Sequence, residues 1–204
     1  MSTLSLRLLR AFCVLFIGGA AIGMLHEYDS AVAAVLLAIL ALFFWRTYQS
    51  NPSTHRAVIL IAGGLFTGFF GVQAELWGIS NGYWVYHDLS DSRTFARWLP
   101  FAWTLAFVFL YRIEDFLFNH LNLYSLKSKL LLVAPLSGLL PAWGEMVAIN
   151  FGAWSYSWGY QIFGVPILSV LLLTVFHVCV FLTLTFICRK YQINDGVYGS
   201  HIGR

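Results

Sequence analysis

Six long apolar runs dominate the sequence and limit what the chain can fold into. They cover residues 8–25, 31–48, 57–76, 97–112, 130–149 and 163–188. A helix that crosses a bilayer needs about 20 mostly apolar residues. Only 10% of the 204 residues are charged, against about 25% in soluble domains. We therefore predict an all-α, polytopic membrane helix bundle with about six transmembrane helices. The composition excludes a soluble domain, a disordered chain and a nucleic-acid binder, although the net charge is +3.

The distribution of basic residues predicts the orientation of this bundle. If both termini are cytoplasmic, the outer side receives only Arg93 and Arg97. The inner side then receives ten basic residues: Arg7, Arg10, Arg46, Arg56, Arg112, Lys127, Lys129, Arg189, Lys190 and Arg204. Because Lys and Arg accumulate in cytoplasmic loops, we expect a multi-pass protein with both termini inside. Arg7 and Arg10 before an apolar run also describe a signal peptide, but no convincing cleavage site follows, which favours a retained helix.

Two segments repeat at a fixed offset of 70 residues. The copies share Glu75 with Glu145, Ile79 with Ile149, Gly82 with Gly152, Trp84 with Trp154, and Tyr86 with Tyr156. Each copy then reaches a proline at the start of the next run, Pro100 or Pro166. Interfacial aromatic belts are an alternative origin for the Trp and Tyr matches, but they do not explain paired glutamates in one register.

The repeat divides the chain into parts of a single integral membrane domain, 1–204. Residues 1–56 form peripheral helices, 57–112 repeat one and 129–190 repeat two. The third and fifth predicted helices both run outward, so the two-helix copies are parallel and related by an axis along the membrane normal. We expect these helices near the bundle centre, with Gly63, Gly64, Gly68 and Gly71 allowing close backbone approach.

Two connecting segments carry simpler expectations. The polar segment 112–129 is expected to hold a short amphipathic helix on the membrane surface. The tail from Tyr191 contains glycine and is expected to fray.

The two repeated glutamates define the predicted site. At 1.5 Å per residue, Glu75 lies about 28 Å from Arg56, and Glu145 about 24 Å from Lys129, near the outer edge of the bilayer. His177 lies near mid-membrane. Ionisable groups at such depths are costly and usually face a bundle interior or a cavity.

These residues suggest acid–base chemistry on a lipid-soluble substrate. A neutral carboxyl can donate a proton to a double bond, aromatic faces can stabilise a carbocation, and a second carboxyl or His177 can accept a proton or orient water. We predict Glu75, Glu145 and His177 as catalytic. The predicted substrate-binding residues are Trp77, Trp84, Tyr86, Trp143, Trp154 and Tyr156.

The second copy resembles the repeat of membrane-bound carotenoid hydratases and small lycopene cyclases. The resemblance rests on Glu145, the Gly152-Ala-Trp154-Ser-Tyr156 motif and the Gly164-Val165-Pro166 step. It implies cyclisation or hydration of an isoprenoid or carotenoid-like lipid; small membrane terpene cyclases are an equal comparison. The lycopene cyclases carry paired acids directly after the helix-opening proline, whereas Phe101-Ala102 and Ile167-Leu168 follow here. The resemblance therefore implies a superfamily rather than a substrate.

Other functions remain open at this stage. A repeat with a site at its interface is common in transporters, and few charges also suit a structural subunit of a membrane complex. No metal site, cofactor or nucleic-acid partner is predicted, and the oligomeric state is not determined. His26, Glu27 and Asp29 are interpreted as a solvated turn, with a role at the outer edge of the site as the alternative.

Overall fold

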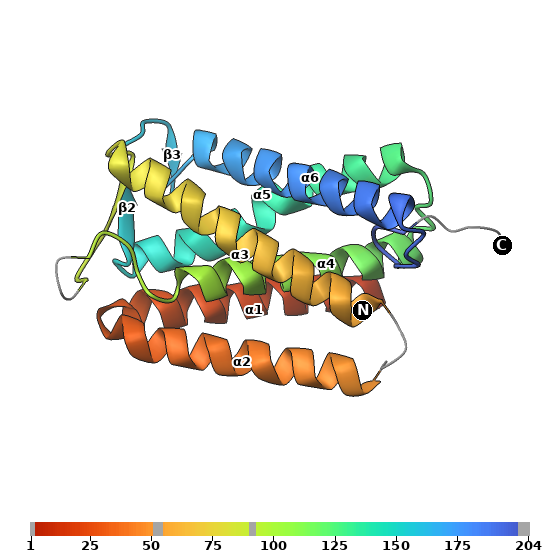
Figure 1. Ribbon diagram of the computed structural model, residues 1–204. Helices are drawn as coiled ribbons and strands as arrows, with labels where there is room; N and C mark the ends of the chain where they lie inside the picture. The colour runs from red at the N-terminus through yellow and green to blue at the C-terminus, as the bar shows by residue number, and fades with distance from the viewer. Residues whose placement is uncertain (1–2, 51–54, 90–92, 200–204) are drawn as a thin grey trace.

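The computed structural model describes residues 3–50, 55–89 and 93–199. Asp91 and Arg204, which carry charge in the predicted loops, lie outside these ranges. The described chain is mostly helical, as expected (Figure 1). Its helices are α1 (Thr3–Leu25), η1 (His26–Tyr28), α2 (Asp29–Ser50), α3 (Arg56–Ser80), α4 (Leu99–His120), α5 (Leu126–Asn150) and α6 (Ile167–Lys190). Its strands are β1 (Trp84–Tyr86), β2 (Trp154–Tyr156), β3 (Gln161–Ile162) and β4 (Val165–Pro166).

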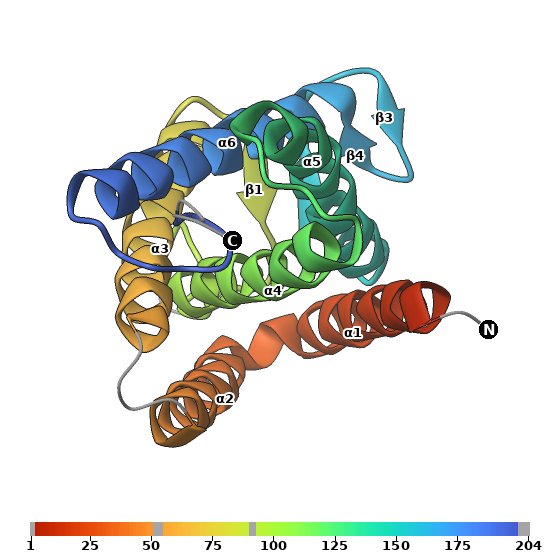
Figure 2. The same ribbon diagram turned by 90° about the vertical axis from the view of Figure 1, so that its right-hand side faces the viewer.

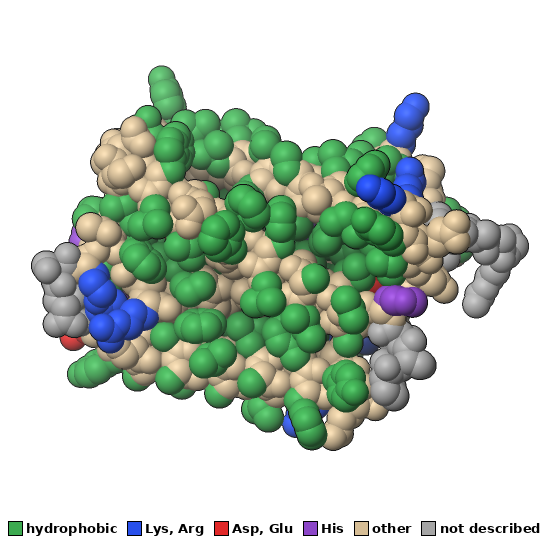
Figure 3. All heavy atoms as spheres, viewed as in Figure 1, with side chains coloured by type: hydrophobic (Ala, Val, Ile, Leu, Met, Phe, Trp, Pro, Cys, Tyr) green, Lys and Arg blue, Asp and Glu red, His purple; other side chains and the backbone are tan. Residues whose placement is uncertain are grey.

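Four stretches of the described chain are long and apolar enough to cross a membrane. They are Thr3–Ser50, Arg56–Ser80, Leu126–Asn150 and Ile167–Lys190. Many of their large apolar side chains point outward: Ile17 is 66% exposed and Leu131 78%. On the face in Figure 3, hydrophobic side chains cover the helices, and the Lys and Arg side chains gather mostly toward the two ends. An apolar surface of this extent belongs in lipid, so this is a membrane protein.

The helices form two layers. The helices α3, α4, α5 and α6 surround a common centre, because α3 packs on α4 and α6, and α5 on α4 and α6 (Figure 2). The hairpin of α1 and α2 lies outside, with α1 on α5 and α2 on α4. We call the end of the bundle that carries the strands the strand end. We call the other end, where α1 begins and α6 ends, the terminus end (Figure 1).

The glycines Gly63, Gly64, Gly68 and Gly71 of α3 face α4. A Cβ atom at Gly71 would lie 2.3 Å from the indole of Trp103, and one at Gly68 would lie 3.0 Å from the backbone oxygen of Pro100. Thr104 Oγ1 donates a hydrogen bond to the carbonyl of Gly64, 3.1 Å away. Close approach is thus achieved between α3 and α4, as small residues on membrane helices permit. The helices α3 and α5 lie on opposite sides of the ring rather than against each other.

Helix α4 is longer than the fourth apolar run predicted. It continues through Arg112, Glu114 and Asp115 to His120, so the separate amphipathic helix expected in segment 112–129 is not present. That segment consists of the end of α4, a short turn and the start of α5. No helix-breaking residue interrupts the chain here. Glu114 is fully buried and faces the ring, where His177 provides a partner 2.8 Å away.

The C-terminal tail is buried, and the expectation that it frays is wrong for the described part. Asp195, Val197 and Tyr198 are all nearly inaccessible. The Tyr198 ring contacts those of Phe107 and Phe181, with centroids 6.5 and 5.3 Å away. Asp195 Oδ2 accepts a 2.7 Å hydrogen bond from the Tyr111 hydroxyl. The tail therefore folds back into the terminus end of the ring (Figure 2).

The α3–α4 contact predicts opposite effects for two Gly→Ala substitutions. Alanine normally stabilises a helix relative to glycine, and at Gly18 a new Cβ would meet nothing within 4 Å. At Gly71 the same atom collides with Trp103. We expect Gly71→Ala to lower the free energy of unfolding by about 1–3 kcal/mol, and Gly18→Ala to leave it unchanged or raise it. Thermal melting of both purified variants in one detergent tests this; equal melting temperatures would show that the two helices are not closely packed.

The buried tail predicts that the Tyr198 ring matters and its hydroxyl does not. Within the described residues this hydroxyl is buried without a hydrogen-bond partner. We expect Tyr198→Ala to cost about 3–5 kcal/mol through the cavity it leaves, whereas Tyr198→Phe retains wild-type stability or exceeds it. Limited proteolysis from the C-terminus is the measurement. A tail that is cleaved equally fast in all three proteins is not held in the ring.

Candidate functional site

The strands β1 and β2 join the two sequence copies at the strand end. They pair antiparallel, with Trp84 opposite Tyr156 and Tyr86 opposite Trp154. The ladder extends by two bonds: His87 N donates to the Ala153 carbonyl at 3.1 Å, and Ser157 N to the Tyr83 carbonyl at 2.9 Å. Adding 70 to the number of the β1 residue and subtracting 70 from the number of its β2 partner converts the first of these pairs into the second. The ladder is therefore symmetric between the copies.

The repeated glycines open the turn that leads into each strand. Gly82 follows α3 with φ +71°, and Gly152 follows α5 with φ +93°. Only glycine adopts this left-handed conformation freely, and it commonly ends helices. The backbone N–H of Gly82 donates to the Ile79 carbonyl, and that of Gly152 to the Ile149 carbonyl. Equivalent turns thus direct each strand back over the glutamate of its own helix.

Glu75 is enclosed by hydrogen-bond donors. Its Oε2 atom accepts from Trp84 Nε1 at 2.8 Å and from the Tyr86 hydroxyl at 2.9 Å. Its Oε1 atom accepts from Trp103 Nε1 at 3.2 Å. An indole N–H can only donate, so two of these three contacts require Glu75 to act as an acceptor. The surroundings suit a carboxylate.

Glu145 has fewer and longer contacts, all with hydroxyl groups. Its Oε2 atom accepts from the Tyr156 hydroxyl at 3.2 Å and lies 3.5 Å from Ser169 Oγ. The two hydroxyls lie 3.0 Å apart. A hydroxyl both donates and accepts, so this environment accommodates either a carboxylate or a protonated carboxyl. Both glutamates are half-buried.

The tyrosines of the two strands connect the glutamates. Burial, followed by the charges of Glu75 and Glu145, raises the pKa of Tyr86 well above its ordinary value. Burial, followed by Glu145 and Glu75, does the same to the pKa of Tyr156. Each phenol therefore stays protonated and donates to the glutamate of its own copy. Because β1 pairs with β2, the tyrosines that bind the two glutamates lie in one ladder although α3 and α5 are not packed against each other.

Aromatic rings form the walls around these carboxyls. The ring centroids of Trp84 and Tyr156 lie 5.6 Å apart, as do those of Tyr86 and Trp154. Trp158 stacks on Tyr156 at 6.0 Å with nearly parallel planes. Such faces carry negative potential that attracts cations. The predicted residues Trp84, Tyr86, Trp154 and Tyr156 are thus gathered at one place.

Three other predicted site residues lie elsewhere. His177 Nε2 lies 2.8 Å from Glu114 Oε1, deeper in the ring. Trp143 faces α1, where its Nε1 atom donates to the Phe12 carbonyl at 3.3 Å. Trp77 is 49% exposed and packs on Tyr83, with ring centroids 5.1 Å apart. None of the hydrogen bonds described for Glu75 or Glu145 comes from these residues.

Sequence reasoning missed Trp103 and Ser169. Each lies three residues after a helix-opening proline, Pro100 or Pro166, and each reaches the glutamate of its own copy. The offset between them is 66 because the first connection is longer. Aligning the copies on the two prolines, rather than at a constant offset of 70, would have identified this pair.

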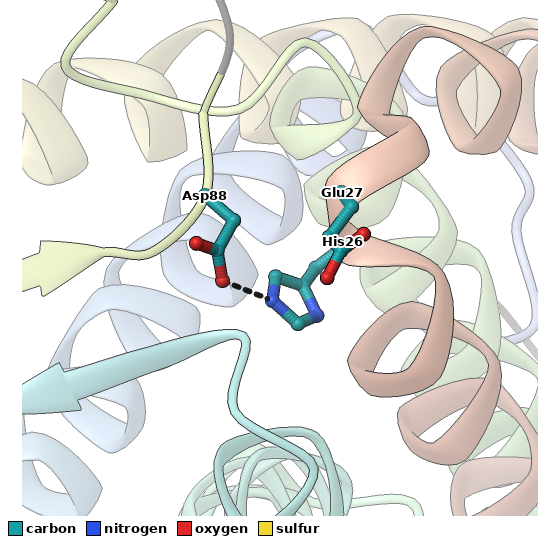
Figure 4. A group of neighbouring side chains, drawn as sticks. All are labelled: His26, Glu27 and Asp88. Carbon is teal, nitrogen blue, oxygen red and sulfur yellow. Dashed lines mark hydrogen bonds and ion pairs between the residues drawn. The ribbon is translucent and has the colours of Figure 1, made fainter.

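One group of side chains near the site has the composition of a metal site. Ligand atoms of His26, Glu27 and Asp88 lie within 4.8 Å of one another, and His26 Nε2 is 3.1 Å from Asp88 Oδ2 (Figure 4). Both acids are exposed, and the hydrogen-bonding contact between His26 and Asp88 is the interaction that the structure shows within the cluster. Asp29 is not part of a solvated turn: it is buried, and Arg93 Nη1 donates to it at 2.6 Å.

We compared the chain with known proteins. No protein-family model, no curated protein and no solved structure matches it. The function must therefore be argued from the site.

Proposed function

We propose that this protein is an intramembrane acid–base enzyme acting on an isoprenoid or a similar lipid. The observation that carries the proposal is the unequal pair of glutamates beneath one aromatic ladder. Glu75 is surrounded by obligatory donors, whereas Glu145 has only hydroxyl partners. In catalytic pairs, one carboxyl group acts as the acid and the other as the base because their different environments give them different proton affinities.

The proposal includes six membrane crossings with both termini in the cytoplasm. Thr3–Ser50 is long enough for two crossings, since it folds as a hairpin of α1 and α2. Helix α4 is the sixth crossing; its charged groups lower its hydropathy, but it lies within the ring. The copies are then related by an axis along the membrane normal, for which the symmetric register of β1 and β2 is the support.

The proposed reaction begins with protonated Glu145. Its O–H bond breaks as the π electrons of a substrate double bond form a C–H bond, which leaves a carbocation on the substrate. The faces of Trp84, Tyr156 and Trp158 stabilise this cation. The cation then loses a proton from a neighbouring carbon to Glu75, giving a new alkene, or combines with water whose proton passes to Glu75, giving an alcohol. Return of that proton to Glu145 completes the cycle.

The two alternatives have less support. A transporter needs a passage that continues to the other side, and Tyr198 and Asp195 fill the ring at the terminus end. In a purely structural subunit, intramembrane carboxyls are expected to pair with cations. Within the described chain, the partners of Glu75 and Glu145 are instead indole and hydroxyl groups. These partners favour a catalytic role for the two glutamates over a purely structural one.

We expect Glu145→Gln to abolish turnover with little effect on stability. The amide keeps the shape and can hydrogen-bond to Tyr156 and Ser169, but it has no transferable proton. General acids contribute about 10²–10⁴-fold to rate. The assay is solvent deuterium incorporation: nanodiscs in D₂O are loaded with linear polyenes such as squalene and lycopene, and the products are analysed by mass spectrometry. Wild type should place deuterium on carbon, and Glu145→Gln should not.

Glu27→Gln is the matched control, because Glu27 is exposed at the same end; it should label substrate as wild type does. Full labelling by Glu145→Gln would overturn its role as the acid. If none of the polyenes is labelled by wild type, a lipid extract of the purified protein decides: absence of any bound isoprenoid contradicts the substrate class.

Glu75→Gln should differ from Glu145→Gln in stability. An amide nitrogen at Glu75 would face an indole N–H that can only donate, leaving at least one buried donor without an acceptor. Such a loss costs about 1–3 kcal/mol. We therefore expect Glu75→Gln to melt at a lower temperature than Glu145→Gln, with both inactive. Equal melting of the two variants would contradict the assignment of Glu75 as the carboxylate.

A further inference from the structure

An open cavity of about 510 Å³ lies at the terminus end, remote from the two glutamates. Its lining residues come from α1, α3 and α4. It is lined by Arg7, Arg56, Arg112, Asp115, Phe116, Asn119 and His120. Nothing in the proposed reaction uses this cavity, and its lining is mostly polar or basic.

Aromatic rings hold the three guanidinium groups of the cavity. The guanidinium carbon of Arg7 lies 5.2 Å from the ring centroid of Phe116. That of Arg112 lies 5.5 Å from the centroid of Phe43, and that of Arg56 lies 5.3 Å from the centroid of Tyr111. Stacking on a ring limits the freedom of a long side chain and leaves the N–H edge of the guanidinium available for hydrogen bonds.

The charges in the cavity do not balance. Its single carboxylate, Asp115, accepts from Arg56 Nη2 at 2.9 Å and from Asn119 Nδ2 at 3.2 Å. Among the described residues, neither Arg7 nor Arg112 forms an ion pair with a carboxylate. Three guanidinium groups and one carboxylate give a net charge of +2 with neutral His120. The exposed guanidinium groups of Arg7 and Arg112 therefore line one open cavity without a carboxylate partner in the described part of the chain and are available to an anion.

We propose that this cavity binds a phosphate group at the membrane border. Guanidinium groups recognise phosphate through paired, charge-assisted hydrogen bonds, and basic pockets between membrane helices bind lipid head groups. The outward surface of α1 beside Arg7 is apolar: Leu6 is 40% exposed and Leu9 50%. Acyl chains can lie along this surface while the phosphate meets the arginines. The phosphate is therefore carried by an anionic lipid or is free in solution.

The test separates a built site from general attraction of basic residues to a membrane. The variant Arg7→Gln/Arg112→Gln removes two cavity charges. Arg10→Gln/Arg46→Gln removes two equally exposed charges at the same end, from residues that do not line the cavity. Both full-length proteins are placed in phosphatidylcholine nanodiscs containing a small fraction of phosphatidic acid. Native mass spectrometry of the released protein then measures the retained phosphatidic acid. Thermal melting of each protein confirms that it is folded.

We expect wild type and Arg10→Gln/Arg46→Gln to retain phosphatidic acid in preference to phosphatidylcholine. The cavity variant should retain it at least about tenfold less, since each lost charged hydrogen bond weakens binding by about that factor. Equal losses in both double variants, or no preference for phosphatidic acid in wild type, would overturn the proposal. If the double variant does not fold, single Arg112→Gln against single Arg46→Gln gives the same comparison.

A second arm identifies what carries the phosphate. Inorganic phosphate is added to wild type in pure phosphatidylcholine nanodiscs, and the melting temperature is measured. A rise that is lost in Arg7→Gln/Arg112→Gln supports the site and assigns it to free phosphate. Retention of phosphatidic acid without a response to inorganic phosphate supports the site and assigns it to a lipid head group. If neither probe binds, the proposal is wrong.

Discussion

The short ladder between β1 and β2 is the interaction on which the site depends. Helices α3 and α5 carry the two glutamates but lie on opposite sides of the ring. The strands that follow them pair directly, with Val85 opposite Ser155 at the centre of the ladder. In this ladder the tyrosine of each copy lies opposite the tryptophan of the other. Each strand therefore donates hydrogen bonds to its own glutamate while packing its rings against the partner strand.

Satisfaction of polar groups explains why the ladder takes this form. In a membrane, water is not available to pair with buried polar groups, so they must find partners inside the protein. Glu75 obtains three donors, one of them from α4. Buried polar groups elsewhere in the ring also have partners within the protein. Glu114 pairs with His177, and Asp195 accepts hydrogen bonds from Tyr111 and from the backbone of its own tail. Each of these buried polar groups thus has a partner close to it in the fold.

Part of the site was predictable because the repeat is local in sequence. Glu75 and Glu145 share a register with Trp84, Tyr86, Trp154 and Tyr156, and these four aromatic residues gather with the glutamates. Trp143 and Trp77 are aromatic and close in sequence to the glutamates, but closeness in sequence does not place a side chain in the site. On a helix, two residues before Glu145 is another face, and Trp143 points to α1. The prediction for His177 concerned its depth along the helix, and depth does not specify a neighbour; the structure places it against Glu114.

The sequence by itself determined the membrane environment, the helical class with six long apolar helices, and the repeated register that includes Gly82 and Gly152. These features depend on run length, hydrophobicity and backbone freedom, which are properties of short segments. Only the tertiary structure decided that the α3 glycines receive Trp103 and Thr104, that α4 continues past Glu114, and that Tyr198 folds into the ring. Those outcomes depend on the rotation of each helix about its axis. That rotation is set by the fit of side chains from distant segments, so no local pattern encodes it.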